Sequence, residues 1–455
     1  MRYYLAIIGG GPAGYTAAEK ASKAGKDVVL FEQNAVGGTC LNVGCIPTKS
    51  LLFGAKQYYN ATHAQKYGVT AENVSFDFAA MQKRKTIVVR KLVAGIKQRL
   101  NNEHCTLVNG FAKVVSRQDP MVSIECNGET YEAENLMICT GSTNFIPPIP
   151  GIKDNPAVWD STDALAATEL PKSIIIVGGG VIGMEFATLY HELGVPVTVI
   201  EAMPSILPNL DPEVVQLLLE KYRKAGINIL TSTKVEEIQS DDLQCIKVKA
   251  NGEWYEAEKV LVSVGRRANL QGLETLRDLE LERGAIKTDE FCKTNLPNVY
   301  ACGDVTGKIM LAHVASRQAE VAVSKMLNAQ SPITNDQTVN YLAIPSVVYS
   351  NPEIASVGIT EQQAAEMSIP VEVRKLPMTF SGRFMVENEG ETGLCKLVLH
   401  AAVHTVLGVH CIGNPCSEFI AAASFAVSKG YTVEEMQQVV FSHPTVSEIL
   451  HEIIV

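Results

Sequence analysis

The chain has 455 residues, more than one hydrophobic core usually serves, so we expect about three domains. A net charge of -10 argues against non-specific nucleic-acid binding. The first residues, MRYYLAIIGG, lack a signal-peptide pattern, and no run of about 20 apolar residues occurs, so we expect no membrane span. The 11 scattered cysteines do not resemble a secreted disulfide framework. We therefore expect a cytoplasmic protein, in which a redox-active cysteine pair is more often catalytic than structural.

The first predicted elements recur later in the chain. The apolar run YLAII enters GGGPAG and is followed by a helical pattern and VVLFE, and IIIV enters GGGVIG in the same way before VTVIE. Gly9 and Glu32 are 23 positions apart, as are Gly178 and Glu201. Two βαβ starts with the same internal spacing predict two dinucleotide-binding domains.

Other elements follow between and after these repeats. We expect a long helix near 76–100, short strands near 105–138 and a stiff proline-rich linker at 147–150. NVYACGDV, at 298–305, is typical of a buried strand followed by a turn. From about residue 336 the pattern changes to alternating strands and amphipathic helices. The predicted fold class is α/β, with two Rossmann-like domains and an α+β C-terminal domain.

Both glycine loops fit G-x-G-x-x-G between a strand and a helix, an arrangement that lets a pyrophosphate sit on the helix N-terminus. The glycines are Gly9, Gly11 and Gly14 in the first loop, and Gly178, Gly180 and Gly183 in the second. One such motif alone is weak, because glycine turns are common, but two copies with a distal acid favour dinucleotide binding. Glu32 and Glu201 can each accept hydrogen bonds from ribose hydroxyls. A carboxylate at Glu201 would repel a 2′-phosphate, which predicts NAD rather than NADP. Arg266 and Arg267 are a caution against this preference, but ordinary surface arginines explain these two residues equally well.

The segment GGTCLNVGCIPTKS, residues 37–50, contains two closely spaced cysteines. Pro47 suits the first turn of a helix, which places Cys45 near a helix N-terminus, where a thiolate is stabilised. Lys49 lies four residues further on, so it can project from the same side of the helix start. A zinc site or two inert thiols is the alternative, but the spacing is not C-x₂-C and no second pair completes four ligands. We therefore expect a redox dithiol at Cys40 and Cys45 and no metal.

The chain resembles the pyridine nucleotide–disulfide oxidoreductases, and among them the lipoamide type. The likeness covers essentially the whole chain and includes GGTCLNVGCIPTK, TGS, GGGVIGMEF, VSVGRR, ACGDV, LAH and HPTVSE, in the order of the family. The cysteine segment and HPTVSE are the most specific of these motifs.

The resemblance implies roles for individual residues. Cys40 looks like the interchange thiol that meets the substrate, and Cys45 like the charge-transfer thiol against a flavin. Lys49 would lie near the flavin's reactive nitrogen, paired with Glu185. The implied FAD contacts are Gly9, Gly11, Gly14, Glu32, Lys49, Ala112, Thr140, Gly141, Ser142, Asp304 and Ala312. The implied NAD contacts are Gly178, Gly180, Gly183, Glu185, Glu201, Val235 and Gly265.

With these cofactors the domains are expected as follows: 1–145, the first part of the FAD-binding domain; 146–268, the NAD-binding domain; 269–335, a central FAD-binding part; and 336–455, the dimerisation domain. The resemblance implies a homodimer in which His443 enters the site of the partner subunit. Pro444 disfavours helix at His443 and suits a helix beginning just after it, and Glu448 is placed to orient the imidazole. From the residues alone, a capping histidine with a solvated glutamate explains this motif at least as well.

The implied activity is oxidation of protein-bound dihydrolipoamide to lipoamide, with reduction of NAD to NADH. The C-terminus carries no extra cysteine pair of the kind that mercuric reductases and large thioredoxin reductases add. Alternatives are a glutathione- or mercuric-reductase-like enzyme, or a flavoprotein that serves as a redox-sensing or interaction component. The partner would be a lipoyl-bearing protein of a 2-oxoacid dehydrogenase or related complex. Cys411 and Cys416 depart from the lipoamide type, and buried structural thiols are the simplest explanation for them.

Overall fold

The computed structural model describes residues 2–118, 121–240, 245–328 and 338–455. The chain forms two compact units. The first contains residues 1–50, 80–145 and 265–339, and the second contains residues 51–79, 146–264 and 340–455. Helices α3 (Cys45–Thr62) and α4 (Phe78–Leu100) each run across a boundary between these segments. The expected boundary at 335/336 lies outside the described residues, and the four-part domain division stays a prediction.

The first unit is built on a seven-stranded sheet with the order β3-β2-β1-β6-β5-β4, and β19 also pairs with β6. Its strands are β1 (Arg2–Ile8), β2 (Val28–Glu32), β3 (Cys105–Asn109), β4 (Ala112–Gln118), β5 (Met121–Cys126), β6 (Glu129–Ile138) and β19 (Val299–Ala301). The pairings of β1 with β2 and β6, of β2 with β3, and of β19 with β6 are parallel, whereas β4, β5 and β6 form an antiparallel meander. Parallel strands buried on both faces need continuous apolar sequence, which VVLFE and VYA provide.

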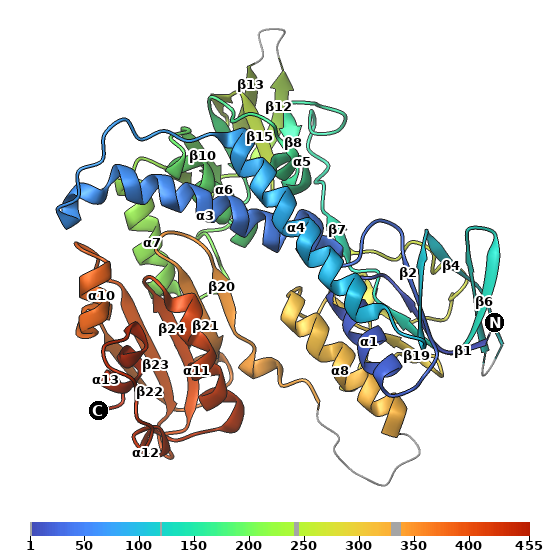
Figure 1. Ribbon diagram of the computed structural model, residues 1–455. Coiled ribbons are helices and arrows are strands. Elements are labelled where there is room, and N and C mark those ends of the chain that lie inside the picture. The colour runs from blue at the N-terminus through green and yellow to red at the C-terminus, as the bar shows by residue number, and fades with distance from the viewer. Residues whose placement is uncertain (1, 119–120, 241–244, 329–337) are drawn as a thin grey trace. The chain divides into compact units, whose positions relative to one another are not determined.

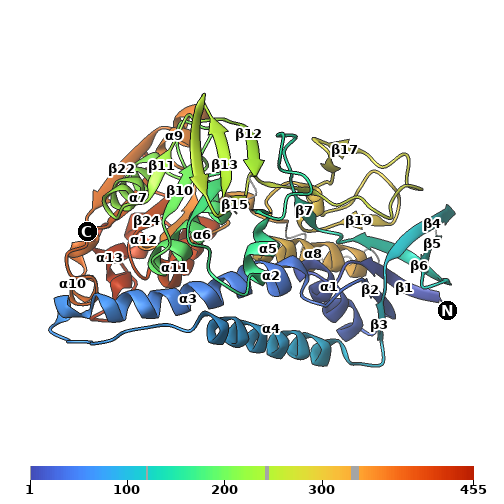
Figure 2. The same cartoon turned by 90° about the horizontal axis from the view of Figure 1, so that it is seen from above.

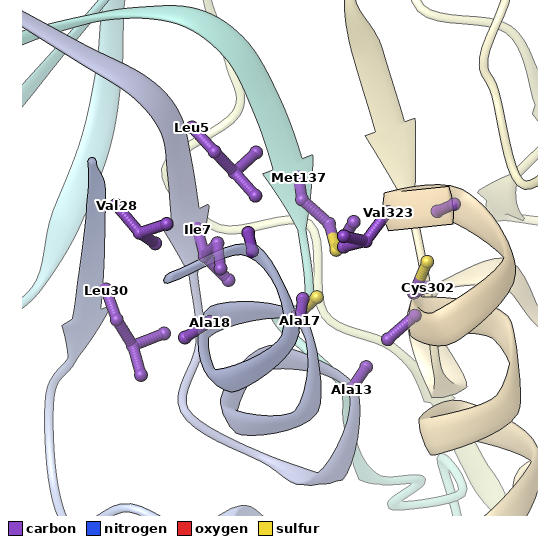
Figure 3. Close-up of a cluster of buried hydrophobic side chains, with 14 of the residues drawn as sticks. Leu5, Ile7, Ala13, Ala17, Ala18, Val28, Leu30, Met137, Cys302 and Val323 are labelled. Atoms are coloured by element: carbon purple, nitrogen blue, oxygen red, sulfur yellow. The ribbon is translucent and has the colours of Figure 1, made fainter. Parts of the chain in front are cut away.

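Two helices cover one face of this sheet. Helices α1 (Pro12–Lys23) and α8 (Ala312–Asn328) pack against each other and lie side by side in Figures 1 and 2. Figure 3 shows how closely α1 approaches the strands: its alanines at 13, 17 and 18 meet Ile7, Leu30 and Met137 in one cluster. Small side chains on α1 allow this approach, because a larger residue would hold the helix away from the sheet.

The remaining elements of the first unit are short. They are α2 (Gly38–Val43), the 3₁₀ turn η2 (Asp304–Thr306), the ribbon of β7 (Ser142–Asn144) with β16 (Arg266–Ala268), and the ribbon of β17 (Leu281–Glu282) with β18 (Ala285–Ile286). The β7–β16 pairing joins residues more than 120 positions apart in the sequence. This pairing joins the segment where the chain leaves the first unit to the segment where it re-enters that unit.

The second unit contains a five-stranded parallel sheet with the order β11-β10-β9-β15-β8. Its strands are β8 (Val158–Trp159), β9 (Ile174–Val177), β10 (Val197–Ile200), β11 (Asn228–Leu230) and β15 (Lys259–Val262), with helices α5 (Ser161–Ala166), α6 (Val181–Glu192) and α7 (Pro212–Lys224). An antiparallel sheet of β12 (Val235–Ser240), β13 (Ile246–Ala250) and β14 (Glu253–Ala257) accompanies it. The two βαβ starts expected from the sequence are therefore both present, one in each unit.

The second unit also holds a five-stranded antiparallel sheet with the order β20-β21-β24-β23-β22. Its strands are β20 (Ser346–Val348), β21 (Ile354–Gly358), β22 (Val371–Leu376), β23 (Leu394–His400) and β24 (Val406–Ile412). The accompanying helices are α9 (Glu361–Glu366), α10 (Gly382–Glu387), α11 (Cys416–Lys429), α12 (Val433–Met436) and α13 (Ile449–Glu452), with 3₁₀ turns η1 (Ala64–Tyr67), η3 (Tyr341–Ala343), η4 (Met378–Phe380) and η5 (Val446–Glu448). Helix α11 packs on β21 and β24.

Candidate active site

The first glycine loop connects β1 to α1 and needs glycine for two different reasons. A Cβ on Gly14 would lie 1.8 Å from the carbonyl oxygen of Gly9, so only glycine lets α1 pack this close to the strand. Gly11 is different, because the nearest atom to a Cβ there is the Cα of Gly38, 3.7 Å away. Gly11 caps α1 without any side-chain hydrogen bond. The N-terminus of α1 therefore has no side chain that caps it, which suits the binding of a pyrophosphate there.

Glu32 closes this loop from the end of β2. Its carboxylate accepts a hydrogen bond from the amide of Gly10 at 2.8 Å through Oε2, and from the amide of Asn34 at 2.8 Å through Oε1. The side chain is buried, and the two charge-assisted bonds offset the desolvation of the carboxylate. The acid predicted to meet a ribose is thus held firmly at the loop.

The second glycine loop repeats this geometry between β9 and α6. A Cβ on Gly183 would lie 2.0 Å from the oxygen of Gly178, whereas a Cβ on Gly180 would have no atom within 4 Å. Glu201 is buried and accepts hydrogen bonds from the amides of Gly179 at 2.6 Å and Met203 at 2.7 Å. The chemistry of this cradle suits a second dinucleotide, with a carboxylate that disfavours a 2′-phosphate.

A chain of hydrogen bonds in the first unit fixes Asp304, which begins η2. The hydroxyl of Ser142 donates to Oδ2 of Asp304 at 2.5 Å. Arg266 in turn donates to that hydroxyl through Nε at 2.7 Å, to the backbone oxygen of Ser142 at 2.8 Å, and to the side-chain oxygen of Asn144. Arg266 therefore lies in the first unit, where it fixes Ser142 and Asn144 and, through Ser142, the carboxylate of Asp304. This role of Arg266 was not predicted from the sequence, in which it was a possible 2′-phosphate ligand or a surface arginine, because β7 and β16 are distant in sequence.

The cysteine segment is tied to the first glycine loop. Gly37, with φ of +104°, donates its amide to the oxygen of Gly10 at 2.8 Å just before α2 begins. Asn42 in α2 donates to the backbone oxygens of Ala35 and Gly38 at 3.1 and 3.0 Å. These bonds hold Cys40 beside the dinucleotide cradle. Asn42 was not among the residues predicted for the site, although its position between the two cysteines was a signal.

Cys40 lies within α2 and Cys45 is the first residue of α3, as Pro47 led us to expect. The pKa of the Cys40 thiol is raised by a hydrogen bond with the Cys45 side chain, then by burial and by the charge of Cys45; the charge of Lys49 acts in the opposite direction. The two sulfur-bearing side chains are therefore in contact. The raised pKa favours the thiol form of Cys40, and a cysteine at a helix N-terminus, such as Cys45, is the one suited to carry a thiolate.

His443 and Glu448 form a pair in the second unit. Nδ1 of His443 lies 2.9 Å from Oε1 of Glu448, and the other carboxylate oxygen accepts the amide of Thr445 at 2.7 Å. The His443 side chain is 79% exposed, whereas that of Glu448 is 18% exposed. The amide of Thr445, and then His443, lower the pKa of Glu448. The carboxylate thus orients an imidazole that is mostly exposed.

Other predicted residues are found on well-defined elements, and their roles stay predictions. Lys49 is on α3, Glu185 is buried on α6 and accepts the amide of Tyr349 at 3.2 Å, and Val235 begins β12. Ala112 begins β4 and Ala312 begins α8. Thr140 donates to the oxygen of Asn269 at 2.6 Å, and Gly141 and Gly265 both have positive φ.

Two properties of the described residues bear on ligands and membranes. Within them no group of three or more His, Cys, Asp or Glu side chains is arranged to hold a metal ion. No helix in the described ranges combines the length and apolar character needed to cross a bilayer.

Two dinucleotide cradles and a contacting cysteine pair define a dinucleotide-dependent dithiol oxidoreductase. Residues 3–319 match the family described as pyridine nucleotide-disulphide oxidoreductase, and residues 344–454 match the dimerisation domain of that family. The chain therefore belongs to the pyridine nucleotide-disulphide oxidoreductase family. It is an enzyme of the FAD-dependent, NAD-linked disulfide oxidoreductase class, and its cofactors are FAD and NAD.

Individual relatives extend this likeness over nearly the full length. The chain is 36% identical over 451 residues to a dihydrolipoyl dehydrogenase of Geobacillus stearothermophilus, covering 98% of this chain and 94% of that protein. It is 38% identical to a dihydrolipoyl dehydrogenase of Bacillus subtilis, covering 99% and 97%. Among solved structures, the HOCl-induced flavoprotein disulfide reductase RclA from Escherichia coli superposes with a TM-score of 0.87 at 28% identity and covers 99% of both chains.

Proposed function

We propose that this protein oxidises protein-bound dihydrolipoamide to lipoamide and reduces NAD to NADH. The observation that carries the proposal is the contact between Cys40 and Cys45 at the start of α3, tethered to the first dinucleotide cradle. Relatives at 36–38% identity that bear the name dihydrolipoyl dehydrogenase support lipoamide as the substrate. When bound, FAD supplies the two-electron carrier between the cysteines and NAD.

The residues of the chain divide the work of thiol–disulfide exchange. Cys40 forms a mixed disulfide with one substrate sulfur while Cys45 leaves as a thiolate, which the helix N-terminus stabilises. The second substrate thiol then displaces Cys40, so the substrate becomes a cyclic disulfide and the enzyme holds two reduced cysteines. His443, oriented by Glu448, accepts a proton from the substrate dithiol.

We further propose that His443 serves the Cys40 of the partner subunit in a homodimer. The match of residues 344–454 to a dimerisation domain and the outward exposure of the imidazole support this arrangement. The partner protein would carry the lipoyl group of a 2-oxoacid dehydrogenase or related complex, in the cytoplasm.

The central test is an anaerobic assay of NADH formation from dihydrolipoamide and NAD. Cys45→Ser should lower kcat by at least about 1,000-fold, because it removes the leaving thiolate and the acceptor disulfide together. Cys105→Ser is the matched control, since Cys105 is a half-buried thiol on β3 outside the site, and it should keep the wild-type rate. Full activity in Cys45→Ser would contradict the proposal.

The dimer proposal has its own test. Cys45→Ser and His443→Gln homodimers should each be inactive, but subunits exchanged between them should form mixed dimers with one intact site. Activity should then return as the subunits exchange. A mixture that exchanges subunits and stays inactive would show that His443 serves its own chain.

A disulfide reductase with another substrate is the second candidate. The likeness to RclA, described as a flavoprotein disulfide reductase, favours it. Rates with lipoamide and glutathione disulfide, each measured with NADH and NADPH, separate the two. Lipoamide with NADH should give the highest kcat/KM, and a preference for glutathione disulfide would overturn the first proposal.

A further inference from the structure

Three cysteines outside the site gather in the core of the second unit. Cys395 lies on β23, Cys411 on β24, and Cys416 is the first residue of α11. All three side chains are fully buried in the hydrophobic cluster between the antiparallel sheet and α11. The activity proposed above uses none of them.

The geometry of two of these cysteines suits a disulfide. Cys395 and Cys411 are direct partners in the antiparallel register of β23 and β24, so their side chains project from the same face. Their sulfur atoms are 3.4 Å apart. Disulfide formation needs a sulfur separation of about 2 Å and Cα atoms about 4.4–6.8 Å apart, a range that directly opposed residues of an antiparallel pair normally satisfy.

Cys416 has different partners. Its thiol donates to the backbone oxygen of Glu353 at 3.2 Å, and a weaker contact of 3.9 Å reaches the backbone oxygen of Cys411. The Cys411–Cys416 spacing of five residues, with the second cysteine beginning a helix, matches that of Cys40 and Cys45. The sulfur of Cys411 nevertheless contacts Cys395, so the sequence spacing points to the wrong pair.

We propose that Cys395 and Cys411 form a second dithiol that hydroperoxides oxidise reversibly to a disulfide between β23 and β24. Hydrogen peroxide first converts one thiol to a sulfenic acid and releases water. The other thiol then displaces hydroxide from that sulfur, which forms the S–S bond and releases a second water. Two thiols thus lose two electrons and two protons to one peroxide, and a dithiol reductant reverses the change.

Burial sets the conditions for this reaction. The hydrogen bond to Cys395 and the surrounding core raise the pKa of the Cys411 thiol, which favours its protonated form, and a protonated thiol reacts slowly with peroxide. Both side chains are fully buried, so a protein-bound lipoyl group cannot contact them, whereas hydrogen peroxide is small and uncharged and can enter when the core opens locally. The pair therefore stays reduced during turnover and is oxidised only at high peroxide concentrations.

Oxidation of Cys395 and Cys411 would affect the segment that carries His443, the proposed base. Val446, Ile449 and Leu450, which flank Glu448, pack into the same hydrophobic cluster as the two cysteines. A bond that draws the sulfurs together changes the packing beneath His443 and Glu448. Oxidation should therefore lower kcat with dihydrolipoamide, although the dithiol itself does not depend on which substrate the enzyme uses.

The test is peptide mapping of the holoenzyme after hydrogen peroxide treatment, with free thiols blocked by N-ethylmaleimide during denaturation. Trypsin places Cys395 on the peptide 384–396, and Cys411 and Cys416 together on the peptide 397–429. A peroxide-dependent link between these peptides is expected, and fragmentation before Pro415 should assign it to Cys411 without any variant. Cys126, fully buried on β5 with glutamates rather than thiols as its charged neighbours, is the reference and should stay a free thiol.

Variants and reductants sharpen the assignment. Cys416→Ala should keep the link and Cys411→Ala should lose it. NADH should restore the thiols of Cys40 and Cys45 alone, whereas dithiothreitol should also break the new link and restore kcat. The proposal would be overturned if no link forms when Cys40 and Cys45 are fully oxidised, if the link involves Cys416, or if NADH reduces the link. Loss of lipoamide activity alone would not overturn it.

Discussion

The two glycine loops are nearly identical in their carboxylate clamps but differ in what lies in front of them. Glu32 and Glu201 each bind two backbone amides at 2.6–2.8 Å. In the first loop, Gly10 also accepts the amide of Gly37, and the cysteine segment approaches within 3.7 Å of a Cβ on Gly11. In the second, a Cβ on Gly180 meets no atom within 4 Å. The repeated fold therefore provides two similar dinucleotide cradles, of which only the first has the cysteine segment beside it.

The largest expected effect comes from removing the close helix–strand approach in either loop. In Gly14→Ala the new Cβ would overlap the oxygen of Gly9, a strain of about 3 kcal/mol or roughly 100-fold in an equilibrium constant. We expect this variant to purify without FAD. Gly183→Ala should instead retain FAD and lose NAD binding. Flavin absorbance and NAD titration measure the two losses, and equal loss of FAD in both variants would contradict separate cofactors for the two loops.

The next effect separates the two acids. Glu32→Gln and Glu201→Gln each weaken two charge-assisted hydrogen bonds, at a cost of about 2 kcal/mol or roughly 30-fold in affinity. Glu32→Gln should speed FAD release. Glu201→Gln should raise KM for NAD, reduce the preference for NAD over NADP and leave the rate of FAD release unchanged. Flavin fluorescence on dilution and steady-state kinetics distinguish these outcomes.

A smaller effect tests the hydrogen bonds behind Asp304. Arg266→Met removes the donors that hold Ser142 and Asn144, so the Asp304 carboxylate loses its fixed orientation. We expect FAD release to accelerate by about tenfold, the value of one charge-assisted hydrogen bond. Arg267→Met is the control, since Arg267 is the exposed neighbour on the same strand. Similar FAD release rates in the two variants would show that Arg266 does not position the Asp304 carboxylate.

The smallest effect concerns the far end of the second loop's helix. Helix α6 ends at Glu192, whose carboxylate accepts a hydrogen bond from Asn351 at 2.7 Å, whereas α1 ends at Lys23. Burial raises the pKa of Glu192 to about 7. Because the folded pKa lies above the unfolded value, stability falls as the pH rises from about 4.5 to 7. Glu192→Gln should therefore have a higher Tm than wild type at pH 8, and the difference should vanish at pH 4; a pH-independent difference would contradict the assignment.

Local spacing explains what could be predicted from the sequence. The two loops, the strand ends at Glu32 and Glu201, the helix start at Cys45 and the reach of Glu448 to His443 all depend on residues within about one element of each other. Arg266 and Cys395 could not be placed in this way. Their partners lie 124 and 16 positions away, and only strand pairing brings them together. The pairing of Lys49 with Glu185 and the individual cofactor contacts remain predictions, since they depend on ligands and on groups from separate units.

The order of synthesis gives the β19–β6 pairing a further meaning. Val299–Ala301 completes a sheet whose first strand is Arg2–Ile8, so a ribosome must make about two thirds of the chain before that sheet can close. The second glycine loop and its sheet leave the ribosome earlier and are complete by Val262. The sheet of the second glycine loop can therefore form on the nascent chain before β19 completes the sheet of the first glycine loop.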